Sequence, residues 1–289
     1  MMKKSTKYVV DNHLCISCGI CEAFTDCDMV YRKGIRLPSF DSLETIKQSE
    51  TVYSYCPGKG YPIVELGNDL YRSSNTKNDF RTGIYLSIGA ARSTKTDLLK
   101  NSSSGAMIPT IALHMLESNV VQGIVTVKYR YSSNGPIPEP FIATTKEHLI
   151  LSQGSKYQPV SLLSIMSEIH EFDGVLAVIG TPCQIAGIRL MQQTDAALKN
   201  KILFTISNFC GGFRDYRETE QIFDLNKVEK NRIRFFSYRG IDQPGQMTIK
   251  QVGRDDVVLP YPDYSRLTGH RKYHRCKVCI DATGELADV

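Results

Sequence analysis

The chain has 289 residues, 42% of them hydrophobic, and a formal net charge of +5. This length and composition fit a globular protein with a sizeable core and exclude an intrinsically disordered chain. The mild positive charge permits an acidic partner or an anionic cofactor without requiring nucleic acid. No apolar run is long enough to span a membrane, and the first ten residues lack a signal peptide, so we expect a cytoplasmic protein.

The most informative stretch lies near the N-terminus, where Cys15, Cys18 and Cys21 are separated by two residues each. One tight loop with this spacing can hold three corners of an iron-sulfur cluster. We expect Cys56 to be the fourth ligand, because a proline follows it as one follows the remote ligand in bacterial ferredoxins. Cys27 is the alternative.

Gly19 lies inside this loop, where a residue without a Cβ atom can adopt a positive φ angle. A zinc site is the less favoured alternative, because structural zinc sites usually use two separated cysteine pairs. A disulfide framework is disfavoured, since the cysteine count is odd and the chain is much longer than small secreted domains. Residues 1–60 are therefore expected to form a small segment held together by metal.

The pattern changes after residues 61–82, which have the composition of a polar linker. Short apolar runs then alternate with helical periods, which indicates an α/β sheet with helices on its faces. The predicted strands are residues 84–90, 121–127, 175–179 and 202–207, and the predicted helices are residues 106–118, 160–172, 184–193 and 214–226.

Two turns join a strand to a helix, which is where α/β proteins bind phosphate groups. The first is the Ser-Ser-Ser-Gly segment at residues 102–105, which could bind a pyrophosphate or simply cap the next helix. In the second, Gly180 ends a buried strand, Pro182 favours the first helical turn, and Cys183 follows. A lone buried cysteine usually serves only in packing.

Three further cysteines give Cys183 a possible partner set. Cys210 follows the next predicted strand, and Cys276 and Cys279 form a Cys-x-x-Cys pair. Because neighbouring parallel strands end at the same edge of a sheet, these four thiols could form a second cluster site. Zinc at the four residues, or a redox-active dithiol at the Cys-x-x-Cys pair, is the alternative.

Ordered motifs along almost the whole chain match one known family. They are residues 15–21, 56–58, Ser103-Ser104-Gly105, and residues 154–157, 180–184, 209–210, 238–240, 244–245 and 276–288. By these motifs the chain resembles the beta subunits of coenzyme F420-reducing hydrogenase and their dehydrogenase relatives, which include ferredoxin-linked reductases of the chlorophyll pathway.

The resemblance implies a ferredoxin-like 4Fe-4S segment at residues 1–60, a linker at residues 61–82, and an α/β domain at residues 83–289 that binds FAD and a second 4Fe-4S cluster. Single electrons would pass through the clusters to the flavin, which exchanges hydride with coenzyme F420 or another acceptor. A ferredoxin or another redox subunit is the expected partner. The alternatives are an electron-relay subunit without its own catalysis and a zinc-stabilised structural or binding protein.

The resemblance also implies residues for the flavin site. They are the turn Ser103, Ser104 and Gly105, the segment Gly180, Thr181 and Pro182, and the cations Lys156 and Arg239. A solvated lysine and a surface ion pair are the simpler interpretations of the two cations. Ala106 departs from the family pattern, which commonly has a glycine there. Family members usually continue beyond Val289, so we expect a C-terminally truncated chain.

Residues 266–275 form a basic stretch beside Cys276. Such a stretch can be a solvated loop or a nucleic-acid patch, and we disfavour the patch. Positive charge beside a cluster would raise its reduction potential and attract an acidic ferredoxin. No hydrolytic arrangement is evident, and no catalytic residue can be assigned from the sequence.

Overall fold

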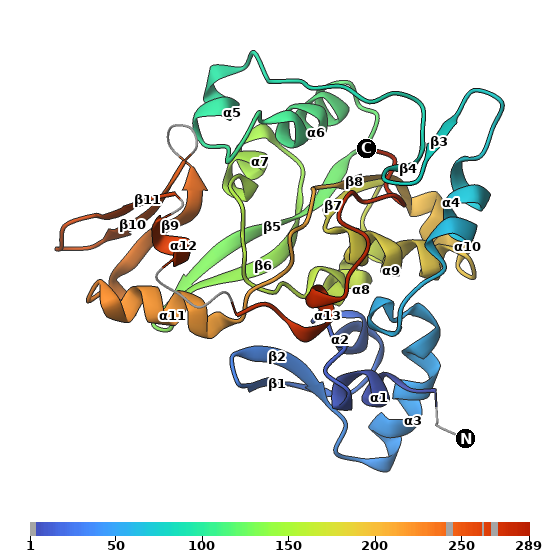
Figure 1. Cartoon of the computed structure of the whole chain (residues 1–289), viewed down its shortest axis with the longest axis horizontal. Coiled ribbons are helices and arrows are strands. Elements are labelled where there is room, and N and C mark those ends of the chain that lie inside the picture. The colour runs from blue at the N-terminus through green and yellow to red at the C-terminus, as the bar shows by residue number, and fades with distance from the viewer. Residues whose placement is uncertain (1–3, 241–244, 262, 267–270) are drawn as a thin grey trace.

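The computed structural model describes residues 4–240, 245–261, 263–266 and 271–289. Residues 267–270 of the basic stretch and Pro244 of the family motifs lie outside these ranges. Figure 1 shows a central sheet covered by helices on both faces, with the N-terminal region packed at one end and a small second sheet at the other. The expectation of an α/β architecture is confirmed.

The central sheet has the strand order β6-β5-β7-β8. Strands β5 (Gly123–Ser132), β7 (Leu176–Gly180) and β8 (Ile202–Ser207) run parallel, and β6 (Gly135–Ala143) pairs with β5 as an antiparallel hairpin. Alternate residues face opposite sides, as expected of strands buried on both faces. Val178 belongs to the core on one side, and its neighbour Ala177 belongs to the core on the other.

Helices cover both faces of this sheet (Figure 1). One face carries α5 (Thr96–Lys100), α6 (Met107–Glu117) and α7 (Lys146–Ser152), and the other carries η3 (Leu162–Ile165), α8 (Met166–Glu171), α9 (Pro182–Gln192) and α10 (Ala196–Lys201). The helices predicted at residues 106–118, 160–172 and 184–193 are therefore confirmed, the second of them as a 3₁₀ turn followed by an α-helix.

The second sheet has the order β11-β10-β9 and packs on a helix. Its antiparallel strands are β9 (Ile233–Gly240), β10 (Gln246–Gln251) and β11 (Val257–Pro260). They follow helix α11 (Tyr216–Leu225), which confirms the prediction at residues 214–226, and the 3₁₀ turn η4 (Lys230–Arg232). The side chains of Ile222 and Phe223 join this helix to the apolar face of the sheet.

The N-terminal region shares its apolar core with the central domain. It contains α1 (Thr6–Asp11), α2 (Ile20–Phe24), the hairpin of β1 (Asp28–Arg32) and β2 (Ile35–Ser39), α3 (Leu43–Thr51), η1 (Val52–Tyr55) and η2 (Pro57–Lys59). Ile16, Ile20 and Val52 lie in the same cluster as Leu162, Val178 and Ile185. This packing fixes the cysteine-rich loop against α9 and η3.

Two segments differ from their sequence predictions. Residues 61–82, expected to be a polar linker, contain α4 (Ile63–Tyr71), whose Leu66 is buried in the main core, and β3 (Lys77–Asp79). The strand predicted at residues 84–90 is wrong beyond its start, because only β4 (Gly83–Tyr85) forms, paired with β3 outside the central sheet. Leu86 and Ile88 are exposed, so this apolar run lacks the cover that would make it a core strand.

The C-terminal segment returns to the central sheet. After α12 (Asp263–Arg266) and α13 (His274–Lys277), the chain runs beside the end of β8, as the red trace in Figure 1 shows. The amide of Cys210 donates to the carbonyl of Ala282, and the amide of Ser207 donates to that of Val289. Among the described residues, no helix has the length and apolarity needed to cross a membrane.

Candidate iron-sulfur and cofactor sites

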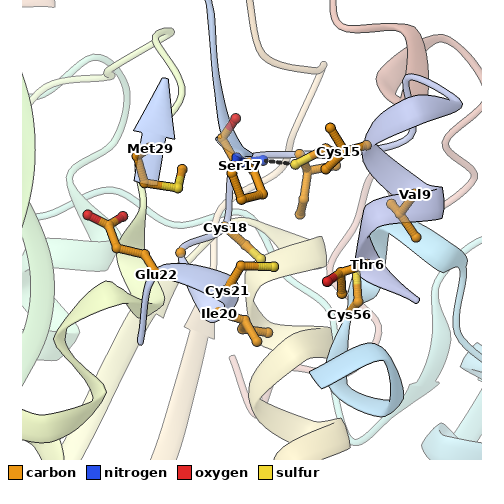
Figure 2. A pocket seen from close by; sticks show the side chains of 14 residues that line it. Thr6, Val9, Cys15, Ser17, Cys18, Ile20, Cys21, Glu22, Met29 and Cys56 are labelled. Carbon is orange, nitrogen blue, oxygen red and sulfur yellow. Dashed lines mark hydrogen bonds between the residues drawn. The ribbon is translucent and has the colours of Figure 1, made fainter. Parts of the chain in front are cut away.

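The first thiol set consists of Cys15, Cys18, Cys21 and Cys56, which line one pocket. In Figure 2 the sulfur atoms of Cys18, Cys21 and Cys56 lie in the same part of this pocket, and the Cys15 sulfur accepts a hydrogen bond from the Ser17 amide. Cys27 does not line the pocket. Of the two expected candidates for the fourth position, Cys56 is therefore the one that the fold places with the other three.

Gly19 fixes the shape of the cysteine loop. Its φ angle is +98°, which confirms the predicted positive φ, and a Cβ atom there would lie 2.5 Å from the Ser164 amide nitrogen. The neighbouring Cys18 carbonyl accepts a hydrogen bond from the Leu163 amide at 2.8 Å. The loop is thus held against η3 by backbone contacts that leave no room for a side chain.

Two cysteines of this set, Cys18 and Cys56, are buried, and Cys15 and Cys21 are partly buried. Burial raises the pKa of Cys15 to about 12, and it also raises the pKa values of Cys18, Cys21 and Cys56. Neighbouring thiols add to the increase for Cys18 and Cys21. Such thiols ionise readily only when a cation replaces the proton, as metal binding does.

The second thiol set consists of Cys183, Cys210, Cys276 and Cys279, which line a separate cavity of about 260 Å³. Cys183 lies in the first turn of α9, directly after β7, and Cys210 follows β8. Since β7 and β8 are parallel neighbours, both thiols lie at the same edge of the sheet, as we expected. The C-terminal segment brings the other two thiols to this edge.

Local contacts position the second set. The side-chain oxygen of Gln184 accepts hydrogen bonds from the Thr181 amide and hydroxyl, which stabilises the start of α9 beside Cys183. Gly212 has a φ angle of +105°, and a Cβ atom there would lie 3.0 Å from the Cys276 Cβ atom. A glycine therefore permits the close approach of the two chain segments that carry Cys210 and Cys276.

Asp281 is a residue of this cavity that the sequence analysis missed. Its side chain is 3% exposed and accepts hydrogen bonds from the Tyr61 hydroxyl at 2.8 Å and the Gly284 amide at 2.9 Å. Burial and the nearby carboxylate raise the pKa of Tyr61, so the phenol stays a donor. The pair ties the loop after Cys279 to the segment between η2 and α4. The only signal for Asp281 in the sequence was an acidic residue two positions after that cysteine.

The two thiol sets share a wall. Ile16, which lies within the first cysteine loop, and Pro57, which follows Cys56, both line the cavity of the second set. Helix α9 also packs closely on the N-terminal region, because a Cβ atom at Gly187 of α9 would lie 3.1 Å from the Ile20 side chain. Apolar side chains thus separate the two sets without an intervening domain.

The predicted flavin residues Ser103 and Arg239 lie in contact. The Ser103 hydroxyl donates to the Arg239 carbonyl at 2.8 Å and accepts from the Ser155 amide at 3.0 Å, while the Arg239 guanidinium donates to the Ser103 carbonyl. That guanidinium also lies over the Tyr261 ring, 4.4 Å from its centre. None of the three serines takes the N-cap position of α6, which is occupied by Ala106.

Lys156 is not the solvated lysine of the simpler interpretation. Its ammonium group donates to the carbonyls of Ser152, Gln153 and Gly154, at the C-terminal end of α7. Burial lowers the pKa of this lysine to about 7. Of the other predicted flavin residues, Gly180 ends β7, Thr181 precedes α9, and Pro182 lines the second thiol cavity.

In the described part of the chain, no three His, Cys, Asp or Glu side chains are arranged to hold a single metal ion. Each thiol set lines a cavity of its own. None of the nine cysteines, all of which it describes, forms a disulfide.

Two family models match the chain. The model described as coenzyme F420 hydrogenase/dehydrogenase, beta subunit N-term, matches residues 88–167, and the corresponding C-terminus model matches residues 173–289. Together they cover well over half of the sequence. The chain belongs to this family. It is thereby a member of an oxidoreductase family, as the resemblance implied.

Curated relatives of this chain carry related names. The coenzyme F420 hydrogenase subunit beta of Methanosarcina barkeri is 24% identical over 220 residues, covering 72% of this chain and 70% of the relative. One subunit of the F(420)H(2) dehydrogenase of Methanosarcina mazei is 20% identical and matches 97% of this chain and 75% of its own length. The coenzyme F420-dependent sulfite reductase of Methanocaldococcus jannaschii is 21% identical, and its match covers 97% of this chain but 42% of the relative.

The fold is also similar to that of a solved hydrogenase chain. A chain of the F420-reducing [NiFe] hydrogenase complex from Methanosarcina barkeri superposes with a TM-score of 0.54 at 21% sequence identity. The match covers 73% of this chain and 72% of that one. At this identity the likeness concerns the fold.

Proposed function

We propose that this protein is an iron-sulfur flavoprotein oxidoreductase that passes electrons between two 4Fe-4S clusters and FAD. The observation that carries the proposal is the grouping of eight cysteines, far apart in the sequence, into two sets of four with a shared wall. Four thiolates per cluster is the usual ligand count of 4Fe-4S sites. The N-terminal set would be the ferredoxin-like centre and the second set the centre of the α/β domain.

The residues present fit such clusters. Each set supplies four thiols, and glycines at positions 19 and 212 allow the close backbone approach that a Cβ atom would prevent. The space among the first four thiols is about 20 Å³, so cluster binding there requires these side chains to turn outward. When bound, the clusters carry single electrons, and a flavin couples them to two-electron hydride chemistry.

The chain's own residues would prepare these sites. The eight thiols release their protons on metal binding. Ile16 and Pro57 keep water out of the wall between the sets, while Tyr61 and Asp281 hold the loop after Cys279 in place. Each of these contacts limits rearrangement around the clusters, which supports electron transfer without large motion.

The flavin site is proposed around Ser103, Ser104, Gly105 and Arg239, with Lys156 contributing charge nearby. The Arg239 guanidinium lies over Tyr261, which gives a planar cation of the kind that binds phosphates and aromatic rings. Helix α6 begins at Met107 after Ala106, which has no polar side chain to cap it, so its first amides are suited to a pyrophosphate. Gly180, Thr181 and Pro182, at the junction of β7 and α9, would contact the same cofactor, and Pro182 also lines the second thiol cavity.

Coenzyme F420 is the proposed hydride acceptor or donor, because several curated relatives are named for reactions of this cofactor. The electron partner would be a ferredoxin or another redox subunit. An electron-relay subunit without its own catalysis is the second candidate, since relatives are named as subunits and the similar structure is a complex. It predicts clusters without reductase activity.

The test is the content of iron, acid-labile sulfide, zinc and flavin in anaerobically purified protein. The proposal predicts about eight irons, matching sulfide and one FAD per chain. Iron and sulfide without flavin, even after incubation with FAD, would favour the relay subunit. Zinc without iron or sulfide would show a structural metal protein instead.

A further inference from the structure

Tyr273 connects the two cysteine-bearing regions at a place apart from the apolar wall. This tyrosine is 2% exposed and directly precedes α13, the helix that carries Cys276. Its phenol oxygen lies 3.4 Å from the hydroxyl oxygen of Ser17. Ser17 belongs to the first cysteine loop, as Figure 2 shows, and a peptide bond joins it to Cys18. One buried tyrosine therefore contacts the loop that carries three thiols of the first set.

The hydroxyl of Ser17 fixes the direction of this hydrogen bond. Ser17 is 2% exposed, and its hydroxyl donates to the Arg36 carbonyl. Because a hydroxyl has a single proton, Ser17 accepts from Tyr273, and the phenol is the donor. Ser17 has a φ angle of +57°, a conformation that costs a glycine nothing. A position whose backbone favours glycine thus carries a side chain, and both of its hydrogen bonds use the hydroxyl.

The backbone of Tyr273 leads on to two thiols of the second set. Its carbonyl accepts a hydrogen bond from the Cys276 amide at 3.1 Å, and its amide donates to the Phe213 carbonyl at 3.2 Å. Gly212 precedes Phe213 and donates its amide to the Cys210 sulfur at 3.4 Å. Covalent bonds and hydrogen bonds therefore run without interruption from the first cysteine loop to both of these thiols.

The apolar wall between the sets is the competing route. Ile16 and Pro57 line the second cavity, but an apolar side chain meets its neighbours only by van der Waals contact, at about 3.5 to 4.0 Å between carbon atoms. An electron tunnels less readily across such a gap than along covalent bonds joined by hydrogen bonds. The route through Ser17 and Tyr273 includes no step of the first kind.

We propose that Ser17 and Tyr273 form the route by which an electron passes between the two centres. The inference rests on the proposed function, because it concerns clusters bound at the two thiol sets. In the transfer one centre loses an electron and the other gains it. No bond breaks, and the Tyr273 phenol keeps its proton and its electrons, since it only transmits the coupling.

The experiment measures how fast an electron redistributes between the centres of the anaerobic, cluster-loaded protein after a reducing flash. Absorption follows the redistribution, and freeze-quenched samples show by electron paramagnetic resonance which centre is reduced. Tyr273→Phe removes the hydroxyl and keeps the buried ring. Ser17→Gly removes the other hydroxyl and suits the positive φ angle. Tyr216→Phe is the matched control, because its hydroxyl donates to the Pro159 carbonyl at 2.9 Å and it lines neither thiol cavity.

The expected result is a severalfold slower redistribution in Tyr273→Phe and in Ser17→Gly, and an unchanged rate in Tyr216→Phe. The double variant of Ser17 and Tyr273 should be no slower than the slower single variant, because both substitutions remove the same contact. Midpoint potentials are titrated in each variant, which separates a change in driving force from a change in coupling. Either single variant suffices if the other does not retain its clusters.

Unchanged rates in loaded Tyr273→Phe or Ser17→Gly would overturn the inference and leave the apolar wall as the route. Equal slowing in the Tyr216 control, or additive slowing in the double variant, would overturn it as well. Iron and sulfide are measured in every sample first. Unmodified protein without clusters would overturn the proposed function and this inference together, whereas loaded protein with unchanged rates would overturn the inference alone.

Discussion

Gly19 holds the first cysteine loop against η3, and its substitution tests that contact. Gly19→Ala places a Cβ atom 2.5 Å from the Ser164 nitrogen and 2.9 Å from the Ser161 carbonyl oxygen, both backbone atoms. A side chain at positive φ costs about 1 to 2 kcal/mol. Overpacking against backbone adds about 1 to 3 kcal/mol. We expect a matching loss in the free energy of unfolding, measured by urea denaturation, and poorer retention of the first cluster.

Gly253→Ala is the control for this substitution. Gly253 has a φ angle of +68°, and the nearest atom to the position of its Cβ atom is a guanidinium nitrogen of Arg232 at 3.5 Å, an ordinary contact. It should therefore show the backbone cost of about 1 to 2 kcal/mol alone. Equal destabilisation by the two substitutions would show that the contact with η3 does not constrain the loop.

Lys156 gives the protein a pH-dependent stability. Its pKa is about 7 in the folded chain, because of burial, against an ordinary value of 10.5. Between pH 7 and pH 10.5 the unfolded chain binds this proton more tightly than the folded chain does. The free-energy cost of burying the charged ammonium is therefore full below pH 7 and decreases as the pH rises. The unfolding free energy of the wild type, relative to Lys156→Met, should increase by more than about 1.4 kcal/mol across this window.

The comparison with Lys156→Met removes the effect of the thiols, which titrate in both proteins. Denaturant unfolding from about pH 6 to pH 10 measures the difference. A difference that is flat or falls with rising pH would contradict a buried Lys156 ammonium.

The site residues that could be predicted from the sequence are the cysteines, because their spacing along the chain is typical of cluster ligands. The Cys-x-x-Cys-x-x-Cys run and the thiols after two adjacent strands are local patterns, and the structure gathers the corresponding side chains. Asp281 could not be recognised in this way. Its role depends on a hydrogen bond from Tyr61 and on a cavity that Ile16 and Pro57 also line, and these residues are distant in the sequence.

At the scale of elements, the C-terminal segment is fastened to α9 and β8 by one buried cluster of hydrogen bonds. Asp288 accepts from the Arg189 guanidinium at 2.8 Å and from the Thr205 amide at 2.7 Å. Arg189 also donates to the Leu286 carbonyl and the Tyr71 hydroxyl. This segment carries Cys276 and Cys279, so its attachment helps to hold these two thiols at the second cavity.

Asp288→Asn should lower the unfolding free energy by about 2 kcal/mol, because it leaves the Arg189 charge buried without its counter-charge. The Asp288 side chain is 25% exposed, which reduces the loss from that of a fully buried pair. Asp11→Asn is the control: its exposed pair with Lys7 should contribute less than about 0.5 kcal/mol. Hydrogen exchange at the Ser207 amide should also quicken in Asp288→Asn, and unchanged exchange would argue against the attachment.

Strand β6 shows why parts of the fold were not predicted. Pro136, Pro138 and Pro140 interrupt its sequence, and prolines usually argue against a strand. In the structure β6 is an edge strand paired only with β5, so the missing amide hydrogens can lie on the unpaired side. Conversely, the apolar run at residues 84–90 suggested a strand, but strand pairing needs a partner that the local sequence does not reveal.

At the scale of the whole molecule, the N-terminal region and the α/β domain form one core around the two thiol sets. Ile16 and Cys18 belong to the same apolar cluster as the strands β5 and β7. The family models match the α/β part from residue 88 onward, and that part supplies the second set. Under the proposed function, one chain therefore holds two clusters with separate ligand sets.

The measurement that tests this claim most directly is the electron paramagnetic resonance spectrum of reduced, anaerobically prepared Cys183→Ala, with its iron content. We predict that iron falls from about eight to about four per chain and that only the signal of the first cluster remains. Cys56→Ala should give the complementary loss, and Cys27→Ala should leave both signals. Loss of both signals in folded Cys183→Ala, or of the first signal in Cys27→Ala, would contradict the division into two sets.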